Sequence, residues 1–231
     1  MSNLFLQGKP GAGKSYLLRL VLEPYRHMAA GYGVQRLYQG QAVAGFRAGN
    51  IRDDFSHLDL YIEPEEKLYL GKDGVFLKTN KCFSNPPQGS LPGQEESCKK
   101  GIRDLSVLEH IIMEAESDSK RKDCRFIVLD EIGGAELGSD TFMKVLCRLL
   151  KGDKPCVGVL KSAANLKSMA EHQGLDHSLI RRHRYLEQLI EESGSLLTLT
   201  EENRGFCKRK LEDFVEKRIK TDETIEYGGN L

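Results

Sequence analysis

Apolar residues along the chain occur in two patterns, short continuous runs and longer amphipathic stretches, and the two patterns alternate. An apolar run at 3–6 ends near a glycine, and a leucine-rich stretch without Gly or Pro follows at 16–22, which predicts a strand, a loop and a helix. Unbroken apolar runs at 126–129 and 156–160 predict strands buried on both faces, as in a parallel sheet. The alternation predicts an α/β fold with a mostly parallel central sheet.

Amphipathic stretches supply the helices that such a sheet needs on its faces. Apolar residues recur at helical spacing within 104–116, 140–150 and 205–220, and a further helical region is expected at 175–192. A strand at 196–199 precedes the last of these helices. The polar, glycine-rich tail is not expected to join the core.

The middle of the chain carries β-rich runs that are too short and too closely spaced for α/β units. They lie at 34–38, 42–46 and 58–62, with further extended runs at 67–70 and 75–77 around a turn signal. These runs predict antiparallel strands added to the parallel core.

A stretch rich in proline, glycine and polar residues follows at 84–101, so we expect a loop-rich insertion at about 71–101. It is either a lid over a ligand or a solvated insertion. With 231 residues, the chain is expected to form a single domain, 1–231, around this insertion.

Composition bears on the partners and the cellular compartment of the protein but does not indicate an activity. The 34 basic and 34 acidic residues cancel, so neither a nucleic-acid nor a membrane partner is expected. No signal sequence and no apolar run of membrane-spanning length are seen, which predicts a cytoplasmic protein. The 6 cysteines are scattered without a C-x-x-C pair and are expected to be reduced, and no cysteine–histidine pattern indicates zinc.

Chemistry first enters at the loop after the first predicted strand, where GKPGAGKS fits the Walker A pattern G-x-x-x-x-G-K-S/T in full. Its glycines let backbone N–H groups approach phosphate oxygens, and the helix that follows directs its positive dipole end at the same anion. Lys14 would contact the β- and γ-phosphates, and the Ser15 hydroxyl would ligate Mg²⁺. The residues expected to bind the nucleotide are Gly8, Lys9, Pro10, Gly11, Ala12, Gly13, Lys14 and Ser15.

A second motif, which is acidic and of Walker B type, follows the buried run at 126–129. Ligands of open α/β sheets gather at the carboxyl ends of the strands. Asp130 is therefore expected to hold Mg²⁺ and Glu131 to act as general base on the attacking water. Lys161 and Ser162 end the next buried strand, where a polar residue could sense the γ-phosphate or merely be solvated.

Four blocks, FLQGKPGAGKS, VAGFRAGNIRDD, DEIGGAELGSDTF and LTEENRGFCKRKLEDF, together resemble the nucleoside-triphosphatase family of small P-loop enzymes that includes the cancer-related NTPase. The resemblance implies a three-layer, RecA-like fold and a magnesium-dependent hydrolase acting on ATP, GTP and other nucleoside triphosphates. It also marks Arg52, Asn203 and Arg204. Either arginine could stabilise charge on the γ-phosphate or form a surface salt bridge, and Asn203 could contact base or ribose.

Glu136 belongs to the same family block, although a role at a helix entry fits it equally well. The pair Gly133 and Gly134 departs from the family pattern and predicts a more mobile loop after Glu131. The basic cluster RRHR at 181–184 is read as a solvated helix face, with nucleotide contact as the alternative.

Two other functions stay open at this point. A nucleotide or nucleoside kinase would use the same phosphate loop to pass the phosphate to a hydroxyl acceptor, and its product would distinguish it. A nucleotide-dependent switch or partner-binding module would show negligible turnover. The adjacent acids at 130 and 131 favour hydrolysis over both.

Overall fold

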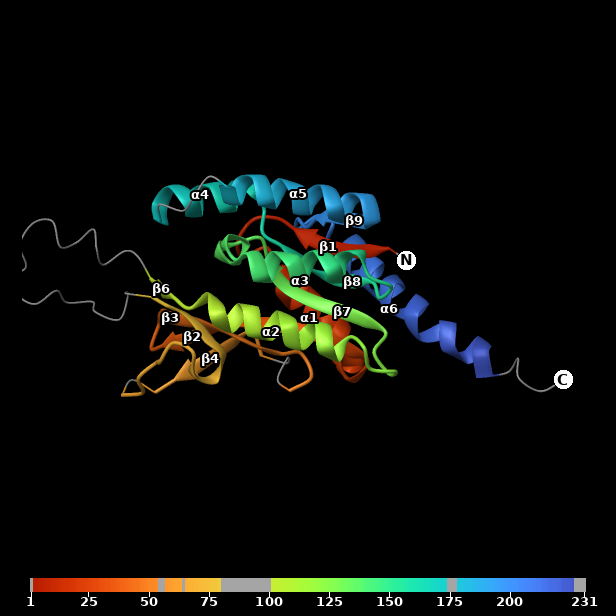
Figure 1. Cartoon of the computed structure of the whole chain (residues 1–231), viewed down its shortest axis with the longest axis horizontal. Coiled ribbons are helices and arrows are strands. Elements are labelled where there is room, and N and C mark those ends of the chain that lie inside the picture. Colours follow the sequence, from red (N-terminus) through yellow and green to blue (C-terminus); the bar gives the residue numbers. More distant parts are fainter. Residues whose placement is uncertain (1, 54–56, 64, 80–100, 174–177, 227–231) are drawn as a thin grey trace, which may run out of the picture.

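A computed structural model describes residues 2–53, 57–63, 65–79, 101–173 and 178–226, without the side chains of 169–173 and 220–226 (Figure 1). Most of the expected insertion, and the lid considered for it, lies outside the described residues. The strands are β1 Asn3–Gln7, β2 Ala29–Gln39, β3 Ala42–Asn50, β4 Asp59–Ile62, β5 Val75–Lys78, β6 Ile102–Arg103, β7 Phe126–Ile132, β8 Cys156–Leu160 and β9 Gly194–Thr198. The helices are α1 Lys14–Leu22, α2 Leu105–Asp118, α3 Asp140–Lys151, α4 Ala163–Gln173, α5 Ser178–Ser193 and α6 Arg204–Glu226, with short 3-10 turns η1 Glu23–Met28, η2 Lys72–Gly74 and η5 Ala135–Gly138.

The described strands form one nine-stranded sheet in the order β6-β5-β3-β2-β7-β8-β1-β9, with β4 paired to β2. Strands β2, β7, β8, β1 and β9 pair in parallel, and β3, β5 and β6 extend the sheet by antiparallel pairing. The predicted α/β class, with a mostly parallel sheet and added antiparallel strands, is confirmed.

Strand β4 departs from this prediction, because it pairs in parallel with β2. The reason is the length of β2, whose first residues pair with β7 while Arg36 and the residues after it pair with β4 along the same edge. The extended run expected at 67–70 forms no strand.

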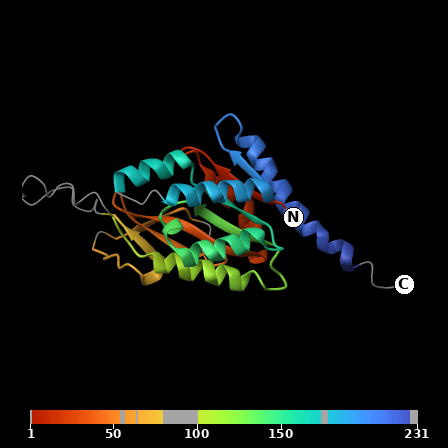
Figure 2. The ribbon, with the colours of Figure 1, turned by 45° about the horizontal axis from the view of Figure 1, so that its top comes forward.

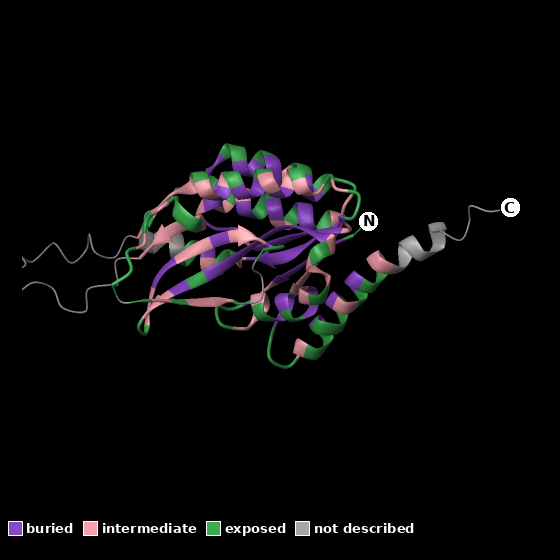
Figure 3. Cartoon of the chain, turned by 90° about the horizontal axis from the view of Figure 1, so that it is seen from below, coloured by how far each residue is buried: buried purple, intermediate pink, exposed green. Residues whose placement is uncertain are grey.

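Helices cover both faces of the sheet, which gives three layers (Figures 1 and 2). One apolar cluster joins α2, α3 and α5 to one face, and a second joins α1 and α6 to the other. Phe126 in β7 meets Phe214 in α6 edge to face, with ring centroids 6.2 Å apart. Figure 3 shows the central strands buried between these layers.

The helix predictions hold except at their edges. Helix α4 was not expected, α5 is described from Ser178 within the predicted helical region, and α6 continues through Glu226 into the expected tail. Strand β7 continues past its apolar run to Ile132, because pairing with β8 resumes there after an irregularity. None of the described helices combines the length and the apolar character needed to cross a membrane.

Asn3, at the start of β1, is only 4% exposed, and its side chain forms hydrogen bonds with α3, α5 and β8. Its amide donates to the Leu150 carbonyl at 2.9 Å and to the Ser193 hydroxyl at 2.8 Å. Its oxygen accepts from the Cys156 N–H at 2.8 Å. These bonds satisfy the polar groups at the ends of α3 and α5 and at the start of β8.

We therefore expect Asn3→Ala to lower the free energy of unfolding by about 2–4 kcal/mol, because it leaves buried backbone groups without partners. Gln7→Ala, at the other end of the same strand, removes an exposed amide contact to Thr198 and should cost under about 1 kcal/mol. Urea denaturation of both variants measures the difference. Equal losses would show that Asn3 does not act through these bonds.

Candidate nucleotide site

The carboxyl ends of β1, β7 and β8 meet at one edge of the sheet because these strands run parallel. A cleft of about 450 Å³ lies there, lined in part by the glycine loop and by side chains at the ends of the other two strands. Among its lining residues are Lys14, Ser15, Glu131, Lys161 and the aromatic Tyr16. The structure thus brings the two sequence motifs to one place.

The glycine loop ends at Gly13, which has a left-handed backbone with φ 82° and precedes α1. A Cβ at this position would lie 3.0 Å from the Arg204 guanidinium, so the loop needs glycine here for its conformation and its packing. No side chain caps α1. Because the first N–H groups of a helix lack intrahelical partners, this end is suited to an anion.

Lys14 bends back over its own loop. Its Nζ donates to the Gly8 carbonyl at 3.0 Å and to the Lys9 carbonyl at 2.8 Å. The pKa of Lys14 lies below its ordinary value, chiefly because of burial and further because of the charge of Lys161, while Glu131 opposes the shift. The amine therefore lies in a partly desolvated position, where an added phosphate would be a favourable partner.

Asp130 is fully buried at 0% exposure. It accepts a hydrogen bond from the Ser15 hydroxyl at 2.7 Å and pairs with Arg19 at 3.4 Å. Burial raises the pKa of Asp130, and the charge of Arg19 and the Ser15 hydrogen bond oppose that rise. The Ser15 hydroxyl of the glycine loop and the Asp130 carboxylate of the second motif therefore lie side by side.

Arg19 is a site residue that sequence reasoning missed. It is 4% exposed and also donates to the carbonyls of Val34, at 2.7 Å, and His57. A signal was available, because Arg19 lies four residues after Ser15 and so on the same face of α1. A charge on the apolar face of a helix that follows a phosphate loop requires a buried partner.

Glu131 follows Asp130 but points elsewhere because the strand is irregular at this point. The register between β7 and β8 shifts between Leu129 and Ile132, and Glu131 has a left-handed backbone with φ 67°. Such an irregularity re-aims a side chain, and this conformation is costly for a residue other than glycine. The Glu131 carboxylate, 37% exposed, pairs with Lys161 at 3.1 Å in the cleft.

Lys161 is the cation on the opposite side of this pair, and its side chain is 23% exposed. Burial alone would lower its pKa, but the charges of Glu131 and Glu136 outweigh burial and raise it. Lys161 is thus protonated at neutral pH. Ser162, also considered as a sensor, accepts from the Asn165 N–H at 3.4 Å at the start of α4.

The loop after Glu131 is packed closely, whereas the glycine pair predicted mobility. Both glycines are buried, and a Cβ at Gly134 would lie 2.8 Å from a Glu136 carboxylate oxygen. Glu136 is itself 7% exposed and accepts from the Gly134 N–H at 2.6 Å. Its role in this structure is to close the loop on itself.

The RRHR cluster on α5 is solvated in part, as predicted, because Arg181 and Arg184 are exposed, but its two middle residues support the same region. Arg182 donates to the Leu137 carbonyl at 2.8 Å and pairs with Asp140 at 2.5 Å. The His183 ring is 1% exposed and bonds to the Lys161 carbonyl. Two residues of this cluster therefore hold the segments that carry Glu131 and Lys161.

The family-marked residues fall in different places. Arg204 reaches the glycine loop, where it donates to the Ala12 carbonyl at 2.9 Å. Asn203 uses its amide locally, donating to the Thr198 carbonyl at 2.8 Å and accepting from the Thr200 N–H at 2.8 Å.

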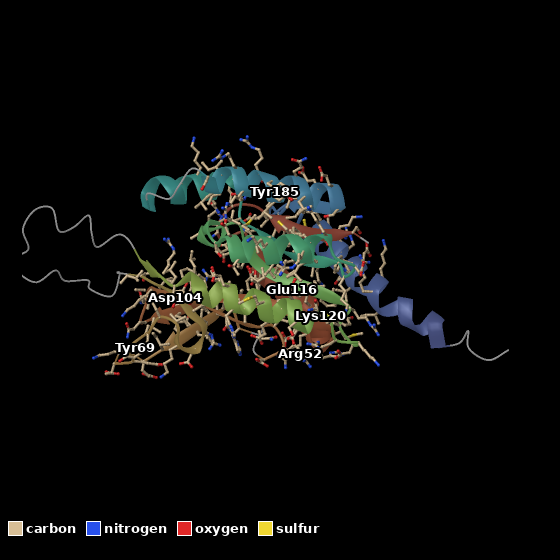
Figure 4. The ribbon with its side chains drawn as sticks, in the orientation of Figure 1. Arg52, Tyr69, Asp104, Glu116, Lys120 and Tyr185 are labelled. Carbon is tan, nitrogen blue, oxygen red and sulfur yellow. The ribbon has the colours of Figure 1, made fainter. Side chains whose placement is uncertain are left out.

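Arg52 is not brought to the cleft. It follows β3, whose end pairs with the start of β2, so it lies at the edge of the sheet opposite the strand ends that form the cleft. Figure 4 shows it below the Lys120 end of α2, away from the Asp104 end. The pKa of Asp123, lowered chiefly by a hydrogen bond from Arg121, is lowered further by Arg52, which agrees with this location.

The residues present fit a magnesium ion. Ser15 and Asp130 offer the hard oxygen ligands that Mg²⁺ prefers, and they are already 2.7 Å apart. Within the described ranges, no group of three or more His, Cys, Asp or Glu could enclose a metal. Mg²⁺ commonly uses one or two protein ligands together with substrate phosphates and water, and Ser15 and Asp130 could be two such ligands.

Replacing Arg19 by methionine should cost about 3–5 kcal/mol of unfolding free energy, because it leaves a buried carboxylate unpaired. The raised pKa of Asp130 gives this loss a pH dependence. The native state binds this proton more tightly than the unfolded chain, and loss of Arg19 tightens that binding further. The loss for Arg19→Met is therefore smallest in acid and grows as pH rises through the pKa of Asp130.

The matched control is Arg36→Met, which removes an exposed pair with Asp59 whose side chains are 46% and 34% exposed. It should cost under about 1 kcal/mol with little pH dependence. Urea denaturation at several pH values measures both variants. A loss for Arg19→Met no larger than the control's would mean that Asp130 does not depend on this arginine.

Known proteins resemble this chain over much of its length. The family model described as NTPase matches residues 92–211. The nucleoside-triphosphatase THEP1 of Ignicoccus hospitalis is 30% identical over 159 residues, which span 68% of this chain and 73% of the relative. The Methanosarcina barkeri protein of the same name is 28% identical over 184 residues, 80% of this chain and 84% of the relative.

The fold also has a solved counterpart. The crystal structure of THEP1 from the hyperthermophile Aquifex aeolicus superposes with a TM-score of 0.53 at 19% identity, covering 94% of this chain and 98% of that one. At that identity the likeness concerns the fold alone, and it agrees with the three-layer α/β architecture described above. The family match and the Ignicoccus hospitalis relative show that this chain belongs to the NTPase family.

Proposed function

We propose that this protein is a magnesium-dependent nucleoside-triphosphatase that removes the γ-phosphate from ATP, GTP and other nucleoside triphosphates. The observation that carries the proposal is the divergence of two adjacent carboxylates. Asp130 turns inward to the Ser15 hydroxyl, and Glu131 turns into the cleft. Hydrolysis needs one carboxylate near the metal and one near the water. Kinship with proteins named nucleoside-triphosphatases supports hydrolysis as the reaction.

Ser15 and Asp130 would hold the magnesium ion. When bound, the ion supplies positive charge that neutralises the β- and γ-phosphate oxygens. The hydrogen bond now joining the Ser15 hydroxyl to Asp130 keeps both oxygens together before nucleotide arrives. Arg19 offsets part of the cost of the buried carboxylate that this arrangement requires.

Glu131 would act as the general base. The water oxygen attacks the γ-phosphorus while the bond from that phosphorus to the β–γ bridging oxygen breaks, and the water proton passes to the Glu131 carboxylate. Lys161, paired with this carboxylate at 3.1 Å, is close enough to exchange that contact for a γ-phosphate oxygen. It is the polar residue that we propose as the γ-phosphate sensor.

The phosphate loop would supply the remaining positive charge. Residues 8–15, except Pro10, offer backbone N–H groups, and the Lys14 amine would exchange the two carbonyls it now contacts for phosphate oxygens. Arg204 touches the same loop at Ala12 and is the better arginine candidate for stabilising transferred charge. No such role is proposed for Arg52, given its place at the opposite edge of the sheet.

Broad base preference is part of the proposal, because the residues assigned here contact phosphates and metal and not the base. Asn203, expected to contact base or ribose, already uses both ends of its amide in the turn before α6. We also propose that the chain works as a single P-loop domain in the cytoplasm, in keeping with one sheet and with free cysteines at 124, 147, 156 and 207.

Glu131→Gln should lower the rate of phosphate release about 100-fold or more while nucleotide binding persists, because it removes the base and keeps the shape. Lys14→Ala should weaken nucleotide binding as well as turnover. Phosphate release from ATP, GTP, CTP and UTP with Mg²⁺, and with EDTA as a control, measures both effects. Release by Glu131→Gln at the native rate would refute its role as base.

The two arginines marked by family resemblance provide an internal comparison. Arg204→Ala should reduce turnover at least about 10-fold, since one charge-stabilising contact is lost near the phosphates. Arg52→Ala is the matched change at the opposite edge of the sheet. It should leave turnover within about twofold of the native protein, whereas the tenfold loss expected for Arg204→Ala corresponds to about 1.4 kcal/mol of transition-state stabilisation. The reverse ranking would overturn the assignment of Arg204.

A further inference from the structure

A second cavity adjoins the nucleotide cleft, and the two share a wall. Glu131, Lys161, Val34 and Phe46 line both spaces. The second cavity extends from this wall toward α2 and β5 and contains none of the phosphate-loop residues in its lining. Whatever occupies it would lie on the side of Glu131 away from the loop.

This cavity is mainly apolar and has the size of one ring. Its volume is about 200 Å³. An apolar cavity of about 150 Å³ in another protein accepts benzene, so a single-ring ligand fits this volume. The apolar lining includes Tyr32, Phe46, Phe76, Leu105 and Leu108, and the rings of Phe46 and Phe76 lie 6.4 Å apart at a tilt of 41°.

Charged groups converge on the cavity in balanced numbers. Glu131 and Lys161 form the ion pair at the shared wall, and Glu136 and Arg103 add one charge of each sign. Burial lowers the pKa of Arg103, and the charge of Glu136 opposes this. Because these charges cancel, a charged ligand would bring an uncompensated charge into a partly desolvated space, which favours a neutral one.

We infer that this cavity binds a neutral single-ring alcohol, whose hydroxyl contacts Glu131 and accepts the γ-phosphoryl group in place of water. The inference rests on the proposed phosphate loop and general base for the donor side. It adds the acceptor: an aromatic or heteroaromatic ring in the apolar part and a hydroxyl at the polar wall. The protein would then have a phosphotransferase activity beside hydrolysis.

The transfer needs no further reactant. The hydroxyl oxygen forms a bond to the γ-phosphorus, and the bond from that phosphorus to the β–γ bridging oxygen breaks. The hydroxyl proton passes to the Glu131 carboxylate, and the nucleoside diphosphate leaves with the bridging oxygen. The product is a phosphate monoester of the alcohol. Glu131 serves both reactions, because each requires a proton to be taken from the attacking oxygen.

The test incubates the full chain with Mg²⁺, ATP and, separately, benzyl alcohol, phenethyl alcohol or nicotinyl alcohol. Phosphorus NMR follows the monoester and inorganic phosphate in the same tube, and ligand-observed proton NMR follows binding. Benzoate, a charged ring compound, tests whether the ligand must be neutral, and propanol, an alcohol without a ring, tests whether the ring is needed. We expect binding and ester formation with ring alcohols, and neither with the two controls.

Cavity-filling variants assign the effect to this space. Ala135→Leu adds bulk to the lining and should lower ester formation at least about 10-fold, equivalent to about 1.4 kcal/mol, while phosphate release changes less than about twofold. Leu105→Phe fills the cavity from a different element, α2, should one variant fold poorly. Ala164→Leu, the same change at an exposed residue of α4, is the matched control and should change neither product.

The outcomes separate the two proposals. Phosphate release without binding or esterification of any ring alcohol would overturn this inference and leave hydrolysis standing. Absence of both products would overturn the proposed function itself. Ester formed equally by the native chain and both cavity-filled variants would show that the acceptor binds elsewhere, which also overturns the assignment.

Discussion

The Asp130 carboxylate lies at 0% exposure between a hydroxyl and a guanidinium, and much of the site follows from this one buried charge. Burying an ionised carboxylate costs several kcal/mol unless partners offset it. Ser15 and Arg19 provide those partners from successive turns of α1. These contacts with Asp130 hold α1 against β7. Because the phosphate loop leads directly into α1, they also fix the end of that loop.

The irregularity after Leu129 gives this arrangement its chemistry. A regular strand would also turn adjacent side chains to opposite faces, but here the left-handed backbone of Glu131 aims its carboxylate into the cleft, where Lys161 meets it. The strain is sustained by the packing around it: Glu136 closes the following loop, and His183 holds the carbonyl of Lys161. Helix α5, which carries His183, thus helps to fix Lys161 beside the acid-bearing end of β7.

Sequence reasoning reached the fold class and the two motifs because both rest on local patterns. The apolar runs identified β7 and β8, and glycine spacing identified the loop before α1. The partner of Asp130 was missed, since Arg19 acquires its role only when α1 packs against β7. The family resemblance marked Arg52 but could not indicate at which edge of the sheet this residue lies. Because β3 runs antiparallel to β2, its end carries Arg52 away from the cleft. The cavity beside Glu131 could not be foreseen, because β2, β3, β5 and α2 assemble it from distant segments.

The central claim, that the adjacent carboxylates have separate roles, is tested most directly by a crystal structure of the protein with Mg²⁺ and a non-hydrolysable ATP analogue. The account predicts the triphosphate on residues 8–15, the ion ligated by Ser15 with Asp130 beside it or bonded to its water, and a water molecule between Glu131 and the γ-phosphate. An ion ligated by Glu131, or a triphosphate bound away from Lys14, would contradict it.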